Sequence, residues 1–117
     1  MPIFNKKRKM KAAVVLHGCG DQDGTDIIEV TSLIIALSEV EAQVKFFAPD
    51  QEQNSVINHK NGKVMKGVKR NVMEESARLV GKDVQPLSKL KAKNFDAMFM
   101  TGGMGVNNDL TNFHEKK

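Results

Sequence analysis

The chain has 117 residues and a mass of 13.0 kDa, so it forms one domain at most. With 40% hydrophobic and 27% charged residues, it has the composition of a globular protein rather than a disordered tail. The longest strongly apolar stretch, Leu33–Leu37, is far shorter than the roughly 20 residues that cross a bilayer. One cysteine excludes an intrachain disulfide framework. The histidines and the cysteine lack metal-ligand spacing, and we predict neither a metal nor another cofactor.

The net charge of +4 is local. Five positive charges lie at the N-terminus, and the rest of the chain carries a net charge of −1; the five residues are Lys6, Lys7, Arg8, Lys9 and Lys11. We predict a solvated basic arm over residues 1–11, with RNA or membrane contact as the alternative, and we expect no nucleic-acid or membrane partner. No apolar segment follows the arm as in a secretory signal, so we expect a reduced, cytoplasmic protein.

The first elements in chain order are a buried strand and a helix. The apolar run Ala12–Leu16 predicts a strand covered on both faces, ended by the glycine turn at residues 17–20. A helix is expected from about Asp26 to Glu41. Asp26 and Glu29 have the spacing of a capping box, in which each side chain bonds to the other residue's backbone N–H. Apolar residues on several sides of this helix indicate that it is mostly buried: Ile27, Ile28, Val30, Leu33, Ile34, Ile35 and Leu37.

A second strand, Val44–Ala48, completes a βαβ unit with parallel strands. The Asn61-Gly62 pair predicts a hairpin between Val56–Lys60 and Lys63–Lys66, with both turn residues at positive φ. Three further elements are expected: a helix capped by Asn71 and ended by Gly81, one helical turn within Ser88–Lys93, and a third buried strand over Ala97–Met100. The remaining residues indicate a loop and the start of a helix.

Two of the buried strands end in glycine-rich turns, at Gly18–Gly20 and at Gly102-Gly103. Ligands of open parallel sheets bind outside the carboxyl ends of the strands, where the strand order reverses. A strand order of 2-1-3 would place both glycine turns beside one crevice. This order locates a binding site without identifying its chemistry.

Several motifs along the chain resemble one known family. They are Leu16–Gly20, Asp23-Gly24, Ile27–Glu29, Phe47–Asp50, Val56–His59, Asn61-Gly62, Arg70–Val72, Ala77-Arg78, Pro86-Leu87, Asp96-Ala97, Gly102–Gly105 and Asn112-Phe113. In register from about Met10 to Phe113, the chain is similar to ElbB-like proteins. These are a branch of the PfpI/ThiJ, class I glutamine amidotransferase-like superfamily, often described as isoprenoid-biosynthesis glyoxalases.

The resemblance implies a flavodoxin-like three-layer α/β sandwich whose nucleophile is a cysteine on a strand-to-helix elbow. In the family that cysteine lies in the second half of a longer chain, so residues 12–117 are expected to be an N-terminal half and the fold incomplete. Gly103 matches the glycine whose N–H helps to form the oxyanion pocket, and Glu29 matches the glutamate that leans towards the nucleophile. Thr101, Met104 and Asn108 depart from the family's usual proline, phenylalanine and lysine.

The residues themselves leave the roles of several groups open. Cys19 lies beside a helix N-terminus that would lower its pKa and near acidic residues that would oppose this, so catalysis with His17, redox reactivity and simple packing are all alternatives. Glu29 is explained equally well as a cap residue. A catalytic set of Glu29, Gly103 and Cys19 is expected. The expected substrate-binding set is Gly18, Gly20, Gly102 and Arg70.

Two functions follow. The first is a truncated glyoxalase-type protein, whose family converts a 2-oxoaldehyde, a small carbonyl substrate, to a 2-hydroxy acid; it is expected to be inactive alone because the elbow cysteine is missing. The second is an assembly module that dimerises or pairs with a complementary polypeptide through the exposed edge of its third strand.

Overall fold

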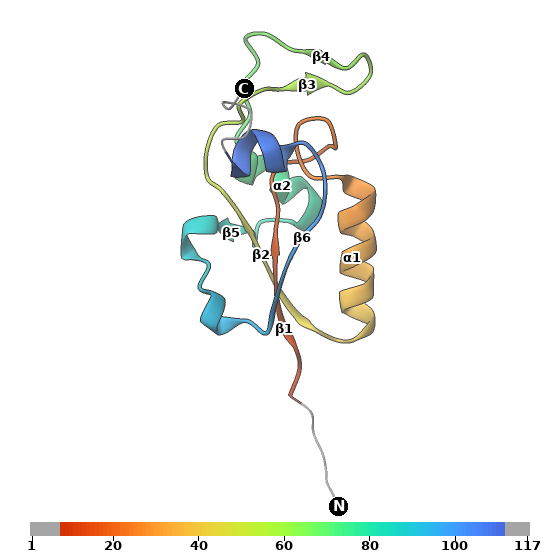
Figure 1. The fold of residues 1–117 in the computed structure, drawn as a ribbon, viewed down its shortest axis with the longest axis vertical. Coiled ribbons are helices and arrows are strands. Elements are labelled where there is room, and N and C mark those ends of the chain that lie inside the picture. The colour runs from red at the N-terminus through yellow and green to blue at the C-terminus, as the bar shows by residue number, and fades with distance from the viewer. Residues whose placement is uncertain (1–7, 112–117) are drawn as a thin grey trace, which may run out of the picture.

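The computed structural model describes residues 8–111. A parallel sheet forms its centre, with two helices, a separate hairpin and short helical turns around it (Figure 1). In chain order the elements are β1 (Lys11–Val15), α1 (Ile27–Glu39), β2 (Gln43–Ala48), β3 (Ile57–Asn58), β4 (Lys63–Val64), α2 (Val72–Val80), β5 (Gln85–Pro86), the 3₁₀ turns Leu87–Lys89 and Ala92–Asn94, β6 (Ala97–Met100) and the π-helical turn Val106–Leu110.

The strand order in the sheet is β5-β2-β1-β6, and all three pairings are parallel. The predicted order 2-1-3 is therefore confirmed for β2, β1 and β6, and so is the flavodoxin-like α/β class. The short strand β5 was not expected; it pairs with only Phe47 and Ala48 at the end of β2. No helix among residues 8–111 is long and apolar enough to span a membrane.

The hydrophobic core lies on the face of the sheet that α1 and α2 cover. Its buried members are Ala12, Val14, Leu16, Val30, Leu37 and Ala48, and apolar residues of α2 pack against them. On the opposite face, the Phe47 ring meets Phe95 edge-on with centroids 5.7 Å apart. Apolar side chains thus cover β1 on both sides, which explains its continuous apolar sequence.

The expectation that α1 is mostly buried is wrong. Only Val30 and Leu37 are buried, whereas Ile28 is 79% exposed and Ile35 is 55% exposed. The helix covers the sheet with one side, and no other described element covers its outer side. Both ends of the helix lie within two residues of the ends predicted from the sequence. Asp26 caps the first turn as expected, by accepting a hydrogen bond from the Glu29 N–H at 3.1 Å.

The hairpin is confirmed, but its turn differs from the expected one. Ile57 pairs with Val64 and Asn58 with Lys63, which leaves the four residues 59–62 as the loop. The Asn58 carbonyl accepts hydrogen bonds from the Asn61 and Gly62 N–H groups at 3.2 and 2.7 Å. Of the two turn residues only Gly62 has positive φ, at 76°, because a longer loop distributes the reversal over more residues.

Strand β6 is less buried than expected, since Met98 and Met100 are 51% and 53% exposed. It is the last strand of the sheet among the described residues, so its outer edge has no strand partner there. The second predicted helix is confirmed. The Asn71 side chain accepts a hydrogen bond from the Glu74 N–H at 2.9 Å, and Gly81 ends the helix with a φ of 90°.

Candidate functional site: two glycine loops at the carboxyl ends of β1 and β6

The turns after β1 and β6 lie side by side because these strands are neighbours in the sheet. Three backbone hydrogen bonds join the two loops. The Asp26 N–H donates to the Gly102 carbonyl at 2.8 Å, the Met104 N–H to Asp21 at 2.8 Å, and the Gly105 N–H to Gly24 at 3.2 Å. The strand order therefore makes the two glycine turns neighbours, as predicted, but the loops are in direct contact, and a crevice beside them stays a prediction.

Glu29 contributes a side chain to this junction. Its Oε1 accepts a hydrogen bond from the Gly102 N–H at 2.8 Å. In a full capping box the carboxylate would instead accept from the Asp26 N–H, which here donates to the Gly102 carbonyl. The reciprocal half of the predicted capping box is thus wrong, because the Gly102 loop provides a competing donor and acceptor.

Gly103 has a backbone conformation that only glycine fits. Its φ is +121°, and a Cβ atom there would lie 2.0 Å from the Gly24 carbonyl oxygen. No acceptor among residues 8–111 takes a hydrogen bond from the Gly103 N–H. This backbone donor directly follows the Gly102 N–H that Glu29 holds, and a donor without an acceptor can stabilise negative charge on a ligand oxygen.

His17, which follows the carboxyl end of β1, supports the loop after β6 through a hydrogen bond to Thr101. It is fully buried, and its Nε2 lies 3.0 Å from the Thr101 carbonyl, which can only accept, so Nε2 carries the proton. Burial lowers the pKa of this imidazole, outweighing the carbonyls of Thr101 and Gly24, which favour the protonated ring. His17 is therefore a buried support for the Thr101 carbonyl, and no hydrogen bond among residues 8–111 joins its ring to Cys19.

Cys19 faces a different set of groups. Burial raises the pKa of its thiol; Arg78 and Arg70 act in the opposite direction, and Glu75 adds to the rise. The sequence offered a helix N-terminus as a cause that would lower the pKa of Cys19, but the net shift of this pKa is upward. No hydrogen bond joins Cys19 to His17 or Glu29 in residues 8–111. A thiol with a raised pKa and no hydrogen bond to either residue is a weaker nucleophile at neutral pH than an ordinary cysteine.

The predicted substrate-binding residues are held in several ways. The Gly18 N–H donates to Ser76 Oγ at 2.9 Å, and the Gly20 N–H donates to the Thr25 carbonyl at 2.8 Å. Both donors are therefore used within the fold. Arg70 forms a 3.2 Å ion pair with Glu75, and none of its ion pairs or hydrogen bonds among residues 8–111 reaches Glu29 or Gly103. Ligand binding by these residues stays a prediction.

Sequence reasoning missed the residues that hold the loops in place. The buried Thr25 accepts the His17 N–H through its hydroxyl at 2.9 Å, and the buried Ser76 holds Gly18. Gly105 lies so close to His17 that a Cβ there would be 2.3 Å from the His17 carbonyl. The glycine at position 105 could have indicated this close packing from the sequence. A single threonine or serine, such as Thr25 or Ser76, gives no such indication.

The chemistry available at the junction is that of a carboxylate and a free N–H donor. Among residues 8–111 no group of three or more His, Cys, Asp or Glu side chains is placed to hold a metal ion. The Gly103 donor can bind a carbonyl or carboxylate oxygen, and Glu29 can hold the loop or exchange a proton with a ligand. A nucleophile is not part of this arrangement.

The chain has similar relatives of greater length. It is 42% identical over 103 residues to the human glutamine amidotransferase-like class 1 domain-containing protein 3, mitochondrial, with 88% of this chain and 38% of the relative covered. It is also 40% identical over 105 residues to the rat ES1 protein homolog, mitochondrial, with 90% and 40% covered. The chain thus spans about two fifths of the length of these curated relatives. No protein-family model matches it.

Its structure is similar to the crystal structure of an isoprenoid biosynthesis protein with an amidotransferase-like domain from Ehrlichia chaffeensis. The TM-score is 0.87 at 31% sequence identity, with 92% of this chain and 51% of the other covered. On fold and sequence together, the chain is similar to proteins named for a class I glutamine amidotransferase-like domain, and this likeness supports a place in that superfamily.

Proposed function

We propose that residues 12–117 are the carbonyl-binding half of an ElbB-like, glyoxalase-type site and that they have no turnover by themselves. The single observation that supports this proposal is that the Gly103 N–H has no acceptor among residues 8–111 and directly follows the Gly102 N–H, which donates to Glu29 Oε1 at 2.8 Å. The glycine and the glutamate are the two residues of this chain that match the family's pocket. The name of the Ehrlichia chaffeensis protein supports the ElbB-like branch.

The reaction adds water to a 2-oxoaldehyde and gives a 2-hydroxy acid. A cysteine thiolate attacks the aldehyde carbon, and the resulting oxyanion needs a donor such as the Gly103 N–H. A proton then moves from the former aldehyde carbon to the neighbouring carbonyl carbon, so the first carbon is oxidised and the second is reduced. Hydrolysis of the thioester releases the acid and restores the thiol.

In this proposal the attacking thiol comes from a complementary polypeptide, because a second copy of this chain could supply only Cys19. Cys19 is the one cysteine of the sequence, its thiol has a raised pKa, and it lies with Arg70, Glu75 and Arg78 rather than with Glu29. The polypeptide that provides this thiol pairs along the outer edge of β6, where Met98 and Met100 are about half exposed. A parallel sheet extended there would bring its own strand end to the Gly103 loop.

Methylglyoxal consumption tests the proposal. The purified chain is expected to form no lactate above the buffer blank. Mixed with the part of the Ehrlichia chaffeensis protein outside the matched segment, it is expected to gain turnover that Glu29→Gln abolishes and Glu39→Gln leaves unchanged. Turnover by the chain alone that is lost on Cys19→Ser would contradict the proposal, and so would a stable 1:1 complex without activity.

The cytoplasmic location remains a prediction. The human and rat relatives carry the word mitochondrial in their names, which makes the location of this chain a question for measurement. Fractionation of the source cells, with the chain detected in the soluble fraction outside any organelle, is the expected result. Recovery with an organelle would contradict it.

A further inference from the structure

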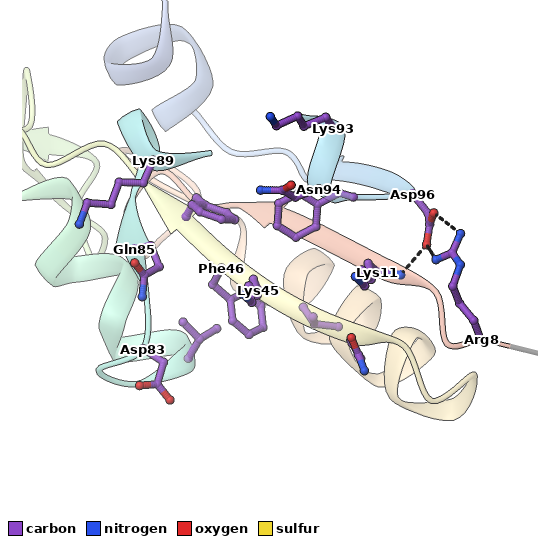
Figure 2. A pocket seen from close by; sticks show the side chains of 15 residues that line it. Arg8, Lys11, Lys45, Phe46, Asp83, Gln85, Lys89, Lys93, Asn94 and Asp96 are labelled. Atoms are coloured by element: carbon purple, nitrogen blue, oxygen red, sulfur yellow. Dashed lines mark hydrogen bonds and ion pairs between the residues drawn. The ribbon is translucent and has the colours of Figure 1, made fainter. Parts of the chain in front are cut away.

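We propose a second binding surface, independent of the glycine loops: a basic groove along the half-open edge of β2 that takes an extended acidic segment of a partner protein as an added strand. The groove has a volume of about 1090 Å³. It lies along β2 and the segment that runs from the 3₁₀ turns into β6, as Figure 2 shows.

The backbone of β2 supplies the first part of the argument. The Gln43 N–H donates to the Met10 carbonyl and the Phe47 carbonyl accepts from Leu16, so the polar groups of both residues point towards β1. In a strand, alternate residues point their N–H and C=O groups to opposite edges. Those of Val44 and Phe46 therefore point to the other edge.

Strand β5 covers only a part of that other edge. It pairs with Phe47 and Ala48 and with no earlier residue of β2. Within residues 8–111, the stretch Gln43–Lys45 thus has a strand partner on one side only, and the Phe46 N–H points to the same open edge. An uncovered edge of this kind is a template for an extended peptide, which gains main-chain hydrogen bonds by joining the sheet.

The side chains around the groove determine the chemistry of the partner. Five basic and two acidic residues line it: Arg8, Lys11, Lys45, Lys89 and Lys93 against Asp83 and Asp96. Arg8 and Asp96 neutralise each other through two hydrogen bonds of 2.7 and 2.9 Å. Figure 2 shows Lys45, Lys89 and Lys93 along the groove, and none of the ion pairs among residues 8–111 uses them.

The lining combines these lysines with aromatic residues, among them Phe46, Phe47 and Phe95. An extended segment that alternates acidic and apolar residues would place its carboxylates at the lysines and its apolar side chains over the rings. Arg8 and Lys11 of the basic N-terminal arm line the groove themselves, and Lys6 and Lys7 carry the same sign of charge as the groove, so the arm is not a suitable occupant. Nucleic acid has the right sign but lacks the peptide groups that Val44 and Phe46 would bind.

The test uses an eight-residue synthetic peptide of alternating glutamate and valine, with a lysine–valine peptide as its control. We expect the acidic peptide to bind, to weaken at higher salt, and to slow amide exchange at Val44 and Phe46. The double variant Lys45→Glu/Lys89→Glu is expected to weaken binding at least tenfold. A matched hairpin variant, Lys60→Glu/Lys63→Glu, with the same change in net charge, is expected to stay within twofold of the wild type.

Equal weakening by both double variants would overturn the proposal, because the attraction would then be general. Unchanged exchange at Val44 and Phe46 would overturn strand addition. Binding of the lysine–valine peptide as tightly as the acidic one would overturn the charge argument. Tighter binding of oligothymidylate, with the same amides affected, would assign the groove to nucleic acid instead.

Discussion

The carboxylate of Glu29, in the first turn of α1, accepts a 2.8 Å hydrogen bond from the Gly102 N–H, at the end of β6. Because the Asp26 N–H also donates to the Gly102 carbonyl, both polar groups of Gly102 are tied to the start of α1. The next residue, Gly103, keeps its N–H free. Because Glu29 uses the Gly102 N–H, only Gly103 of the Gly102-Gly103 pair has an N–H available to a ligand.

Replacement of Glu29 is expected to reduce stability. Glu29→Ala leaves the Gly102 N–H without its partner and should lower the free energy of unfolding by about 1 kcal/mol. Glu29→Gln keeps an accepting oxygen and should lose less. Urea unfolding at pH 7 measures both. The matched control is Glu39→Gln at the other end of α1, which should be close to neutral; equal losses for all three variants would show that the bond with Gly102 is not the cause.

A side chain at position 103 is expected to prevent native folding. In Gly103→Ala the new Cβ would lie 2.0 Å from the Gly24 carbonyl oxygen, at a φ of +121°. The control is Gly67→Ala, where φ is +79° and no atom lies within 4 Å, so only backbone strain of about 1–2 kcal/mol is added. Thermal unfolding by circular dichroism should show a folded Gly67→Ala protein and no cooperative transition for Gly103→Ala. Similar transitions for both would contradict the close contact.

The stability conferred by His17 should depend on pH. Burial lowers its pKa in the folded chain below the ordinary value of 6.5, so the folded state resists protonation. The contribution is complete above about pH 6.5 and declines as the pH falls towards the folded pKa. The difference in unfolding free energy between the wild type and His17→Gln, which cannot take up a proton, should therefore shrink between pH 7.5 and 5.5. A difference that is constant over this range would contradict the lowered pKa.

Cys19 should react slowly with thiol reagents. Burial raises the pKa of its thiol, Glu75 adds to the rise and Arg78 opposes it. With a disulfide reagent at pH 7.5, the folded chain should therefore react more slowly than the urea-unfolded chain. Glu75→Gln should speed the reaction and Arg78→Gln should slow it. The chain has one cysteine, so the rate reports a single site. The same rate in all variants would indicate that access, rather than charge, controls the thiol.

Much of the fold follows from the sequence because it depends on local patterns. The apolar run at Ala12–Leu16 identifies β1, and the spacing of Asp26 and Glu29 and of Asn71 and Glu74 identifies the first turns of α1 and α2. Helix caps and buried strands are set by residues close together in the chain, so one sequence is enough to place them.

The tertiary structure alone decided the partners of these elements. The sequence explained Glu29 as a cap residue, but a loop 73 positions later offers a better donor in Gly102. It gave Ile28 and Ile35 as core, but one sheet face can bury only one side of a helix. It left a Cys19–His17 pair open as one alternative, whereas in residues 8–111 no hydrogen bond joins these two residues and the imidazole donates to the Thr101 carbonyl. Contacts between distant segments depend on how the strands are ordered and packed, and no spacing in the sequence encodes them directly.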